Sequence, residues 1–186
     1  PEAAPAGVVR VIEGRAACSE ITMALVRLND GQHLLAFNDF YLGQRSHVSS
    51  RYSLTWREQT ERQSSSGVLV STGAGCTGWF SSTRNMAAAV SGLLLDGAAP
   101  ALPRLRLAWD DPRLVFVVRE PFLSRSSGVR LTAGLVEAGE ELRFESHMPD
   151  GGVIFSDGVE ADTLAFNAGA VATVRAADRR TRLVAA

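Results

Sequence analysis

The sequence predicts a mainly β protein, a multi-stranded antiparallel β-sandwich with one short helix. Short apolar runs rich in β-branched residues recur along the chain, and turn signals such as Asn29-Asp30-Gly31 and Asp110-Asp111-Pro112 separate many of them. Within Tyr52-Ser53-Leu54-Thr55-Trp56 the apolar residues lie two apart, which is typical of a strand with one buried face. The sequence therefore predicts consecutive strands rather than strands that alternate with helices.

Strands are expected wherever such a run occurs. In chain order, these runs are Val8–Ile12, Ile21–Leu28, Leu34–Leu42, Val48–Trp56, Val68–Thr72, Leu105–Trp109, Leu114–Val118, Val129–Leu135, Glu141–Glu145, Gly152–Phe155, Ala170–Val174 and Thr181–Val184. The segment Arg57–Ser66 contains only polar and charged residues, so we interpret it as a long turn between two strands.

One stretch, roughly Gly78 to Val90, has the composition of a helix. Its segment Met86-Ala87-Ala88-Ala89-Val90 favours helix, and Ser91-Gly92 is a plausible stop signal. The Ala-, Pro- and Gly-rich segment Asp96–Pro103 is a weaker candidate for a linker. We expect a single domain over residues 1–186, because this length suffices for one sizeable core.

Composition narrows the function classes. The net charge is −1, which gives no electrostatic signature of a nucleic-acid or membrane partner, and no apolar run approaches the roughly 18 residues that span a bilayer. All 19 basic residues are arginine, so this chain supplies no P-loop or Schiff-base lysine. Cys18 and Cys76 have neither a disulfide nor a metal-ligand pattern, and with no export signal the expected location is cytoplasmic.

The segment with the most chemical content is Ser66–Ser82. A β-branched run, Val68-Leu69-Val70, leads into Thr72-Gly73-Ala74-Gly75-Cys76-Thr77-Gly78, and an aromatic residue and two serines follow. Such a turn presents backbone N–H groups and hydroxyls beyond the end of a strand. This arrangement is typical of a cradle for a nucleotide or a phosphate.

Two other interpretations of this turn remain open. Gly73 to Gly78 match the pattern G-x-G-x-x-G, and Asp96 follows about 20 residues later, as in a dinucleotide-binding βαβ unit. However, the flanking segments predict consecutive strands without intervening helices, and a doubly wound sheet requires strands that alternate with helices. The turn could also be a plain glycine turn without a ligand.

Three motifs together resemble the NAD kinase family. The turn Thr72–Trp79 is similar to the family signature Thr-Pro-Thr-Gly-Ser-Thr-Ala-Tyr. Upstream, Asn38-Asp39 ends an apolar strand like the family's Asn-Glu/Asp motif, and downstream Ser156-Asp157-Gly158 is similar to its strand that ends in an Asp-Gly turn. The order and spacing of the three motifs make the resemblance more specific than any one of them.

The resemblance implies an NAD-binding role for nine residues. They are Asn38, Asp39, Ser66, Thr72, Gly75, Thr77, Gly78, Trp79 and Ser82. Asn38 and Asp39 would hydrogen-bond NAD, and Thr77 would reach its adenine. Trp79 takes the position of the family's tyrosine, and Ser82 would follow one helical turn later, facing the same pocket.

Three of the departures from the family pattern bear on the choice of substrate. Gly73 replaces a proline, Gly78 replaces an alanine, and Ser66 stands where many members carry an aspartate. These changes leave the phosphoryl acceptor open.

The family's Gly-Gly-Asp-Gly motif, which holds the catalytic aspartate, is absent from the sequence. In the family it belongs to an N-terminal α/β domain, so this chain resembles the C-terminal, mostly β domain alone. The resemblance implies a part of an enzyme that converts NAD to NADP with ATP and a divalent metal such as Mg²⁺, and that assembles as a homodimer or homotetramer. We expect no catalytic residue, no metal ligand and no activity in this chain by itself.

Two alternatives are kept. The chain could be a non-catalytic β-sandwich that binds nucleotides or acts as a scaffold, or part of a related kinase that acts on a sugar or a lipid. The remaining candidates for chemistry are His33, His47 and His147, which have no metal-ligand spacing, and Arg45, Arg51 and Arg125, which could meet phosphates. For all six, an exposed position on the sheets is the favoured interpretation.

Overall fold

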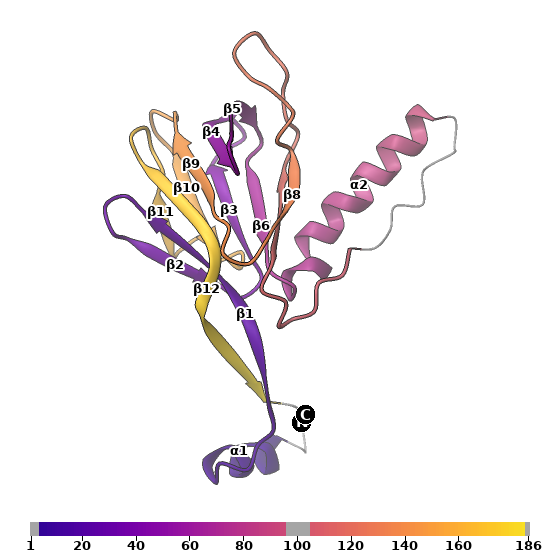
Figure 1. The fold of residues 1–186 in the computed structure, drawn as a ribbon, viewed down its shortest axis with the longest axis vertical. Helices are drawn as coiled ribbons and strands as arrows, with labels where there is room; N and C mark the ends of the chain where they lie inside the picture. Colours follow the sequence, from indigo (N-terminus) through magenta and orange to yellow (C-terminus); the bar gives the residue numbers. More distant parts are fainter. Residues whose placement is uncertain (1–3, 96–104, 185–186) are drawn as a thin grey trace.

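Two β-sheets packed face to face form the body of the protein in the computed structural model, which describes residues 4–95 and 105–184 (Figure 1). The first sheet contains β1 (Cys18–Leu28), β2 (His33–Ala36), β4 (Ser50–Trp56), β5 (Gln59–Ser65), β9 (Leu142–Ser146) and β12 (Val171–Val184). The second contains β3 (Asp39–Gln44), β6 (Val68–Ser71), β7 (Leu114–Val118), β8 (Ala133–Val136), β10 (Gly152–Ser156) and β11 (Thr163–Ala165).

The strand orders are β2-β1-β12-β9-β4-β5 and β11-β10-β3-β6-β7-β8, and each neighbouring pair is antiparallel. These sheets confirm the predicted antiparallel β-sandwich. The predicted linker Asp96–Pro103 and the acidic residue Asp96 lie outside the described residues.

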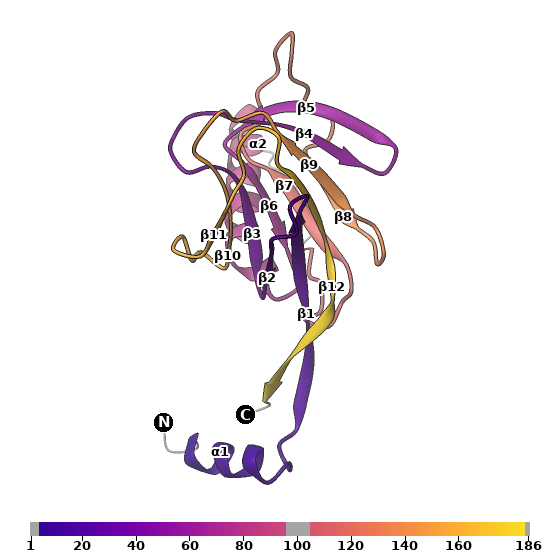
Figure 2. The same ribbon diagram turned by 90° about the vertical axis from the view of Figure 1, so that its left-hand side faces the viewer.

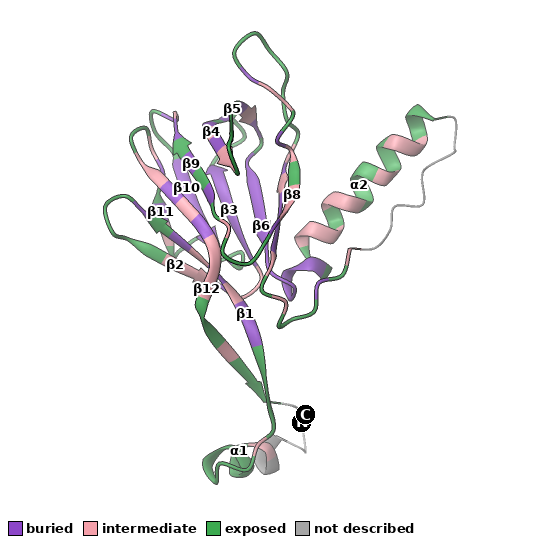
Figure 3. Ribbon diagram, viewed as in Figure 1, coloured by how far each residue is buried: buried purple, intermediate pink, exposed green. Residues whose placement is uncertain are grey.

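The main core lies between the two sheets and draws side chains from both. Phe40 and Phe116 enter it from the second sheet, and Leu54 and Phe144 enter it from the first, all with no exposed area. Buried residues accordingly follow the sandwich in Figure 3. Because side chains alternate along a strand, Tyr41 points away from this core to the outer face of the second sheet.

The predicted strand Val8–Ile12 is wrong, because these residues belong to the helix α1 (Ala4–Ile12). The helix lies beyond the far end of the β1–β12 ribbon, away from both sheets (Figure 2). An apolar run forms a strand only where a neighbouring strand can pair with its backbone. Without such a neighbour, hydrogen bonds within a helix satisfy these backbone groups.

The predicted long turn Arg57–Ser66 is also wrong, because most of it is strand β5, which pairs with β4. Its inward residues are polar but buried. Glu61 accepts hydrogen bonds from the backbone N–H groups of Arg130 and Leu131, and Gln63 donates one to the Leu131 carbonyl. Polar side chains that hydrogen-bond to a neighbouring loop can occupy a buried strand face, here even though the Gln63 Oε1 has no partner within the described residues. Composition alone conceals such a strand.

Three smaller corrections concern strand limits. The run Leu34–Leu42 breaks into β2 and β3, and the predicted strands Ala170–Val174 and Thr181–Val184 are one strand, β12. Leu105–Trp109 is not a strand, and within Val129–Leu135 strand structure begins only at Ala133. The break between β2 and β3 places Phe37 and Asn38 outside the ladder, which matters for the site.

The predicted helix is confirmed as α2 (Trp79–Leu94), which follows a short 3₁₀ turn, η1 (Gly75–Thr77). The predicted stop at Ser91-Gly92 is wrong, because the helix continues through both residues to Leu94. It begins next to the second sheet and extends away from it, and none of its residues is buried (Figures 1 and 3). Among the described residues, no helix has the length and apolar character needed to cross a bilayer.

Candidate functional site

The ends of three neighbouring strands lie side by side at one end of the second sheet. Asp39 at the start of β3 pairs with Ser71 at the end of β6, and Phe40 pairs with Ser156 at the end of β10. The loops that adjoin these ends therefore lie together. They are the motifs Asn38-Asp39, Thr72–Gly78 and Asp157-Gly158, which are far apart in the sequence.

These loops enclose a cavity of about 320 Å³, which we call the turn cavity. Its lining consists of Asn38, Asp39, Ala74, Gly75, Thr77, Gly78, Trp79, Asp157 and Gly158. Six of the nine residues proposed from the sequence thus share one cavity. The side chain amide of Asn38 and the carboxylate of Asp39 have no hydrogen-bond partner among the described residues, so both are available to a ligand.

Thr72 and Gly75 fix the shape of the turn. The Thr72 hydroxyl donates to the Phe37 carbonyl at 2.6 Å and accepts from the Gly75 N–H at 3.3 Å, while the Thr72 N–H donates to the Asn38 carbonyl at 2.9 Å. A Cβ at Gly75 would lie 2.1 Å from the Asn38 carbonyl oxygen. The turn therefore packs backbone against backbone, and glycine is required at position 75 because of this close approach.

Asp157 holds the opposite wall in place. Its carboxylate accepts hydrogen bonds from the backbone N–H groups of Phe37, Asn38 and Asp39, at 2.9, 2.6 and 3.2 Å. Asp157 has a φ of 53°, a left-handed conformation that is uncommon outside glycine. This one side chain satisfies the N–H groups exposed by the break between β2 and β3, and it thereby orients Asn38 and Asp39.

Asp39 is the carboxyl group with the most perturbed environment in this cavity. Burial, together with the negative charge of Asp157, raises the pKa of Asp39 to about 6. Keeping this carboxylate ionised near neutral pH therefore costs the folded protein free energy. A ligand hydroxyl that donates a hydrogen bond to it would lower this cost.

The three remaining sequence candidates lie elsewhere. Thr72 is fully buried behind the turn, where it acts on the backbone of the loop Phe37-Asn38. Ser82 is exposed on the first turn of α2, with its hydroxyl 3.5 Å from the Gly78 carbonyl oxygen, and it does not line the turn cavity. Ser66 lines a different cavity, on the other side of Trp79.

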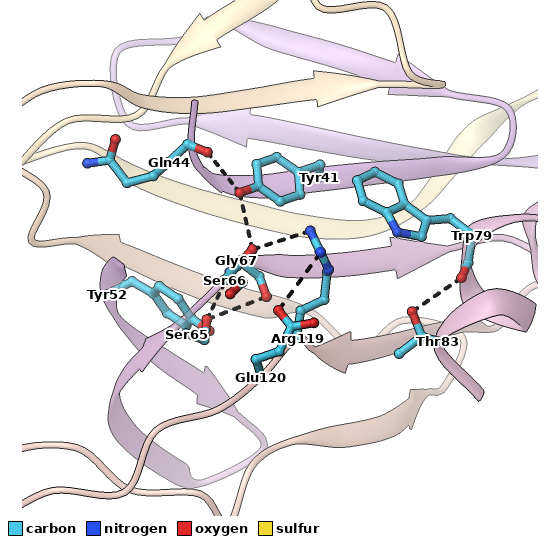
Figure 4. Close-up of polar contacts among 10 residues, drawn as sticks. All are labelled: Tyr41, Gln44, Tyr52, Ser65, Ser66, Gly67, Trp79, Thr83, Arg119 and Glu120. Carbon is cyan, nitrogen blue, oxygen red and sulfur yellow. Dashed lines mark hydrogen bonds and ion pairs between the residues drawn. The ribbon is translucent and has the colours of Figure 1, made fainter. Parts of the chain in front are cut away.

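We call this second space, of about 380 Å³, the aromatic cavity. Tyr41 stacks on Trp79 with ring centroids 5.8 Å apart and on Phe155 at 5.0 Å. The Tyr41 hydroxyl donates to the carbonyls of Gln44 and Ser66 and so fixes the ring (Figure 4). Burial raises the pKa of Tyr41, which keeps this hydroxyl a donor. The cavity is lined by Tyr41, Gln44, Arg45, Ser46, His47, Val48, Ser66, Trp79, Arg119, Glu120, Val153, Phe155, Glu160 and Thr163.

The sequence did not single out Asp157 as a site residue, although its Asp-Gly turn after a strand was visible. It also gave no sign of Arg119, which comes from the end of β7 and lies over the Trp79 ring at 5.2 Å. Trp79 lines both cavities and therefore lies at their common boundary.

The described residues do not support a metal site. In the described ranges, 4–95 and 105–184, no group of three or more His, Cys, Asp or Glu side chains could hold a metal ion. The turn cavity offers only two carboxylates, and Asp157 already accepts three backbone hydrogen bonds. We therefore derive no chemical step through a metal ion from this chain.

The fold is similar to that of a solved kinase. A crystal structure of yeast NADH kinase complexed with NADH matches with a TM-score of 0.71 at 15% sequence identity. The match covers 100% of this chain and 49% of that one, so this chain spans about half the length of the kinase. A scan against protein-family models and a search of curated proteins both found no match.

At this identity the similarity establishes the fold. The chain is a β domain with an NAD kinase-like fold, consistent with the C-terminal domain predicted from the sequence.

Proposed function

We propose that this chain is the NAD-binding and oligomerisation domain of an NAD kinase-like phosphotransferase, which converts NAD to NADP in the complete enzyme. One observation carries the proposal. The three motifs of the sequence resemblance, far apart in the chain, line a single cavity in which the Asn38 amide and the Asp39 carboxylate have no protein partner among the described residues. The similarity of the fold to yeast NADH kinase supports it.

The turn cavity suits one end of a dinucleotide. An amide offers both donors and an acceptor to the edge of a base, and a carboxylate accepts hydrogen bonds from ribose hydroxyls. Exposed Thr77 adds a hydroxyl at the mouth, and half-buried Trp79 adds an aromatic wall. The N–H groups at the start of α2 favour a negative charge nearby.

Titration of the chain with NAD tests the proposal. We expect Asn38→Ala to weaken NAD binding by roughly 1–3 kcal/mol, because a buried polar group of the ligand loses its partner. The exposed Asn85→Ala on α2 is a matched control that should leave the affinity unchanged. Unchanged affinity of a folded Asn38→Ala variant would remove Asn38 from the site, and no NAD binding by the unmodified chain would overturn the proposal.

Phosphoryl transfer needs an in-line geometry, a metal–phosphate clamp and a base. The sequence lacks the Gly-Gly-Asp-Gly motif that supplies the catalytic aspartate in the family. We therefore expect the purified 186-residue chain to bind NAD without converting it. ATP-dependent formation of NADP by this chain, measured with Mg²⁺ present, would contradict this expectation.

A further inference from the structure

The aromatic cavity has a flat apolar floor on the outer face of the second sheet. Tyr41, Trp79 and Phe155 provide it: the Tyr41 and Trp79 rings are stacked with nearly parallel planes, at an angle of 7°, and Tyr41 also stacks on Phe155. Both polar contacts of the Tyr41 hydroxyl are made within the protein. Because Tyr41 and Phe155 are buried, the apolar ring surface that a ligand can reach comes mainly from half-buried Trp79. Such a surface packs against a planar base or against the apolar face of a sugar ring.

One wall of this cavity carries a positioned arginine. Arg119 lies over Trp79, and its guanidinium contacts the Ser66 carbonyl at 3.5 Å and the Glu120 carboxylate at 3.8 Å (Figure 4). These contacts are long and involve few of the five N–H donors of a guanidinium. The aromatic ring therefore holds the side chain in place while most of its donors stay available.

The facing wall comes from the loop between β3 and β4. It contributes Arg45, Ser46 and His47, all exposed, and none of these side chains makes a hydrogen bond or an ion pair within the described ranges. Glu120 and Glu160 also line the cavity; the Glu120 carboxylate makes the long 3.8 Å contact with Arg119, and the Glu160 carboxylate has no hydrogen-bond partner within the described residues. Arg45 and Arg119 therefore supply the charged donors of the cavity, and two carboxylates belong to the same lining.

Backbone strain marks the same place. Glu120 has a φ of 41°, and it directly follows Arg119. A non-glycine residue in this region is uncommon, and such strain is concentrated at binding and catalytic sites. Asp157 of the turn cavity shares this conformation, as does Arg57 in the turn between β4 and β5, which lines neither cavity.

We propose that the aromatic cavity is a second ligand site, distinct from the turn cavity, for a ring compound that carries a phosphate group. The flat face of the ring packs on the apolar floor, mainly on half-buried Trp79, and the phosphate accepts hydrogen bonds from Arg45 and Arg119, whose forks suit phosphate oxygens. A phosphorylated sugar and a mononucleotide share this chemistry. The proposal does not depend on NAD binding in the turn cavity.

Calorimetric titration of the full 186-residue chain with glucose 6-phosphate, AMP and inorganic phosphate tests the site. We expect at least one ring phosphate to bind about ten-fold more tightly than inorganic phosphate, because only the ring uses the aromatic floor. Tighter binding of glucose 6-phosphate would identify a sugar source, and tighter binding of AMP a nucleotide source. No preference for a ring phosphate, or no binding of either, would overturn the proposal.

Substitutions assign the binding to this cavity. Arg45→Gln and Arg119→Gln should each weaken binding of the ring phosphate roughly ten- to hundred-fold, which is the range expected when a charged hydrogen bond is lost. Exposed Arg125→Gln makes the same charge change elsewhere and should have no effect. If Arg119→Gln fails to fold, Arg45→Gln decides, because the Arg45 side chain contributes no hydrogen bond or ion pair to the described structure. Unchanged affinity in a folded Arg45→Gln variant would overturn the proposal.

The Asn38→Ala variant separates this proposal from the NAD site. This variant should lose affinity for NAD and keep its affinity for the ring phosphate. AMP is titrated into this variant as well, because the substitution weakens binding of AMP to the turn cavity. Loss of ring-phosphate binding in a folded Asn38→Ala variant would place that ligand in the turn cavity and overturn a second site. Ring-phosphate binding without any NAD binding would support the second site while the proposed NAD function fails.

Discussion

The two cavities on either side of Trp79 are built in different ways. The turn cavity is formed mostly by backbone at three strand ends, with Thr72, Gly75 and Asp157 holding loops against one another. The aromatic cavity is formed by side chains on a sheet face and on exposed loops. The first therefore depends on backbone packing at the strand ends, whereas the second also depends on exposed side chains of loops. Three predictions test this difference.

The largest effect is expected for Gly75→Ala. The added Cβ would lie 2.1 Å from the Asn38 carbonyl oxygen, so two backbone segments must move apart. We expect a loss of about 2–4 kcal/mol of unfolding free energy, measured by urea denaturation.

Gly78→Ala is the matched control, because its nearest contact would be an ordinary 3.5 Å. It should change stability by less than about 1 kcal/mol. Equal stability of the two variants would show that the turn is not held by backbone packing.

A smaller effect is expected for Asp157→Ala, which removes the acceptor of three backbone N–H groups. Asp157 is exposed, so water replaces part of the loss, and the stability should fall by about 1–2 kcal/mol. Because Asn38 and Asp39 lose their orientation, NAD affinity should fall about ten-fold in the same calorimetric assay.

Asp162→Ala in the same loop is the control for Asp157→Ala. Asp162 is exposed, and its carboxylate accepts no hydrogen bond within the described residues, so neither quantity should change. If Asp157→Ala behaves like this control, Asp157 does not position the wall of the turn cavity.

The third prediction is a gain in stability of Asp39→Asn. The pKa of Asp39 rises from 3.8 to about 6 on folding, so the folded state binds the proton more tightly than the unfolded state. The stability of the unmodified chain should therefore fall as the pH rises through the range between these two values.

Asparagine is neutral at every pH, so the Asp39→Asn variant should be more stable near neutral pH by roughly 1–3 kcal/mol. Thermal denaturation over a pH series measures this difference, which should disappear below the unfolded pKa. NAD affinity should fall in the same variant, because the carboxylate acceptor is lost. A stability difference that does not change with pH would contradict the raised pKa.

The parts of the fold that could be predicted are those with a strong local pattern. Apolar runs at period two and the alanine-rich segment before Ser91 located most strands and α2, because local propensity and tertiary structure agree there. β5 was missed, since Glu61 and Gln63 are buried through hydrogen bonds that other loops supply. α1 was missed, since whether an apolar run pairs as a strand depends on its neighbours.

The candidate site shows the same division. By itself, the sequence determined that Asn38-Asp39, Thr72–Gly78 and Asp157-Gly158 follow strands, because apolar runs and turn residues mark strand ends locally. Only the tertiary structure decided that β3, β6 and β10 are neighbours, which unites these motifs and makes Asp157 their clamp. It alone also placed Arg119 over Trp79. Contacts between residues far apart in the chain depend on strand order and register, which no local pattern encodes.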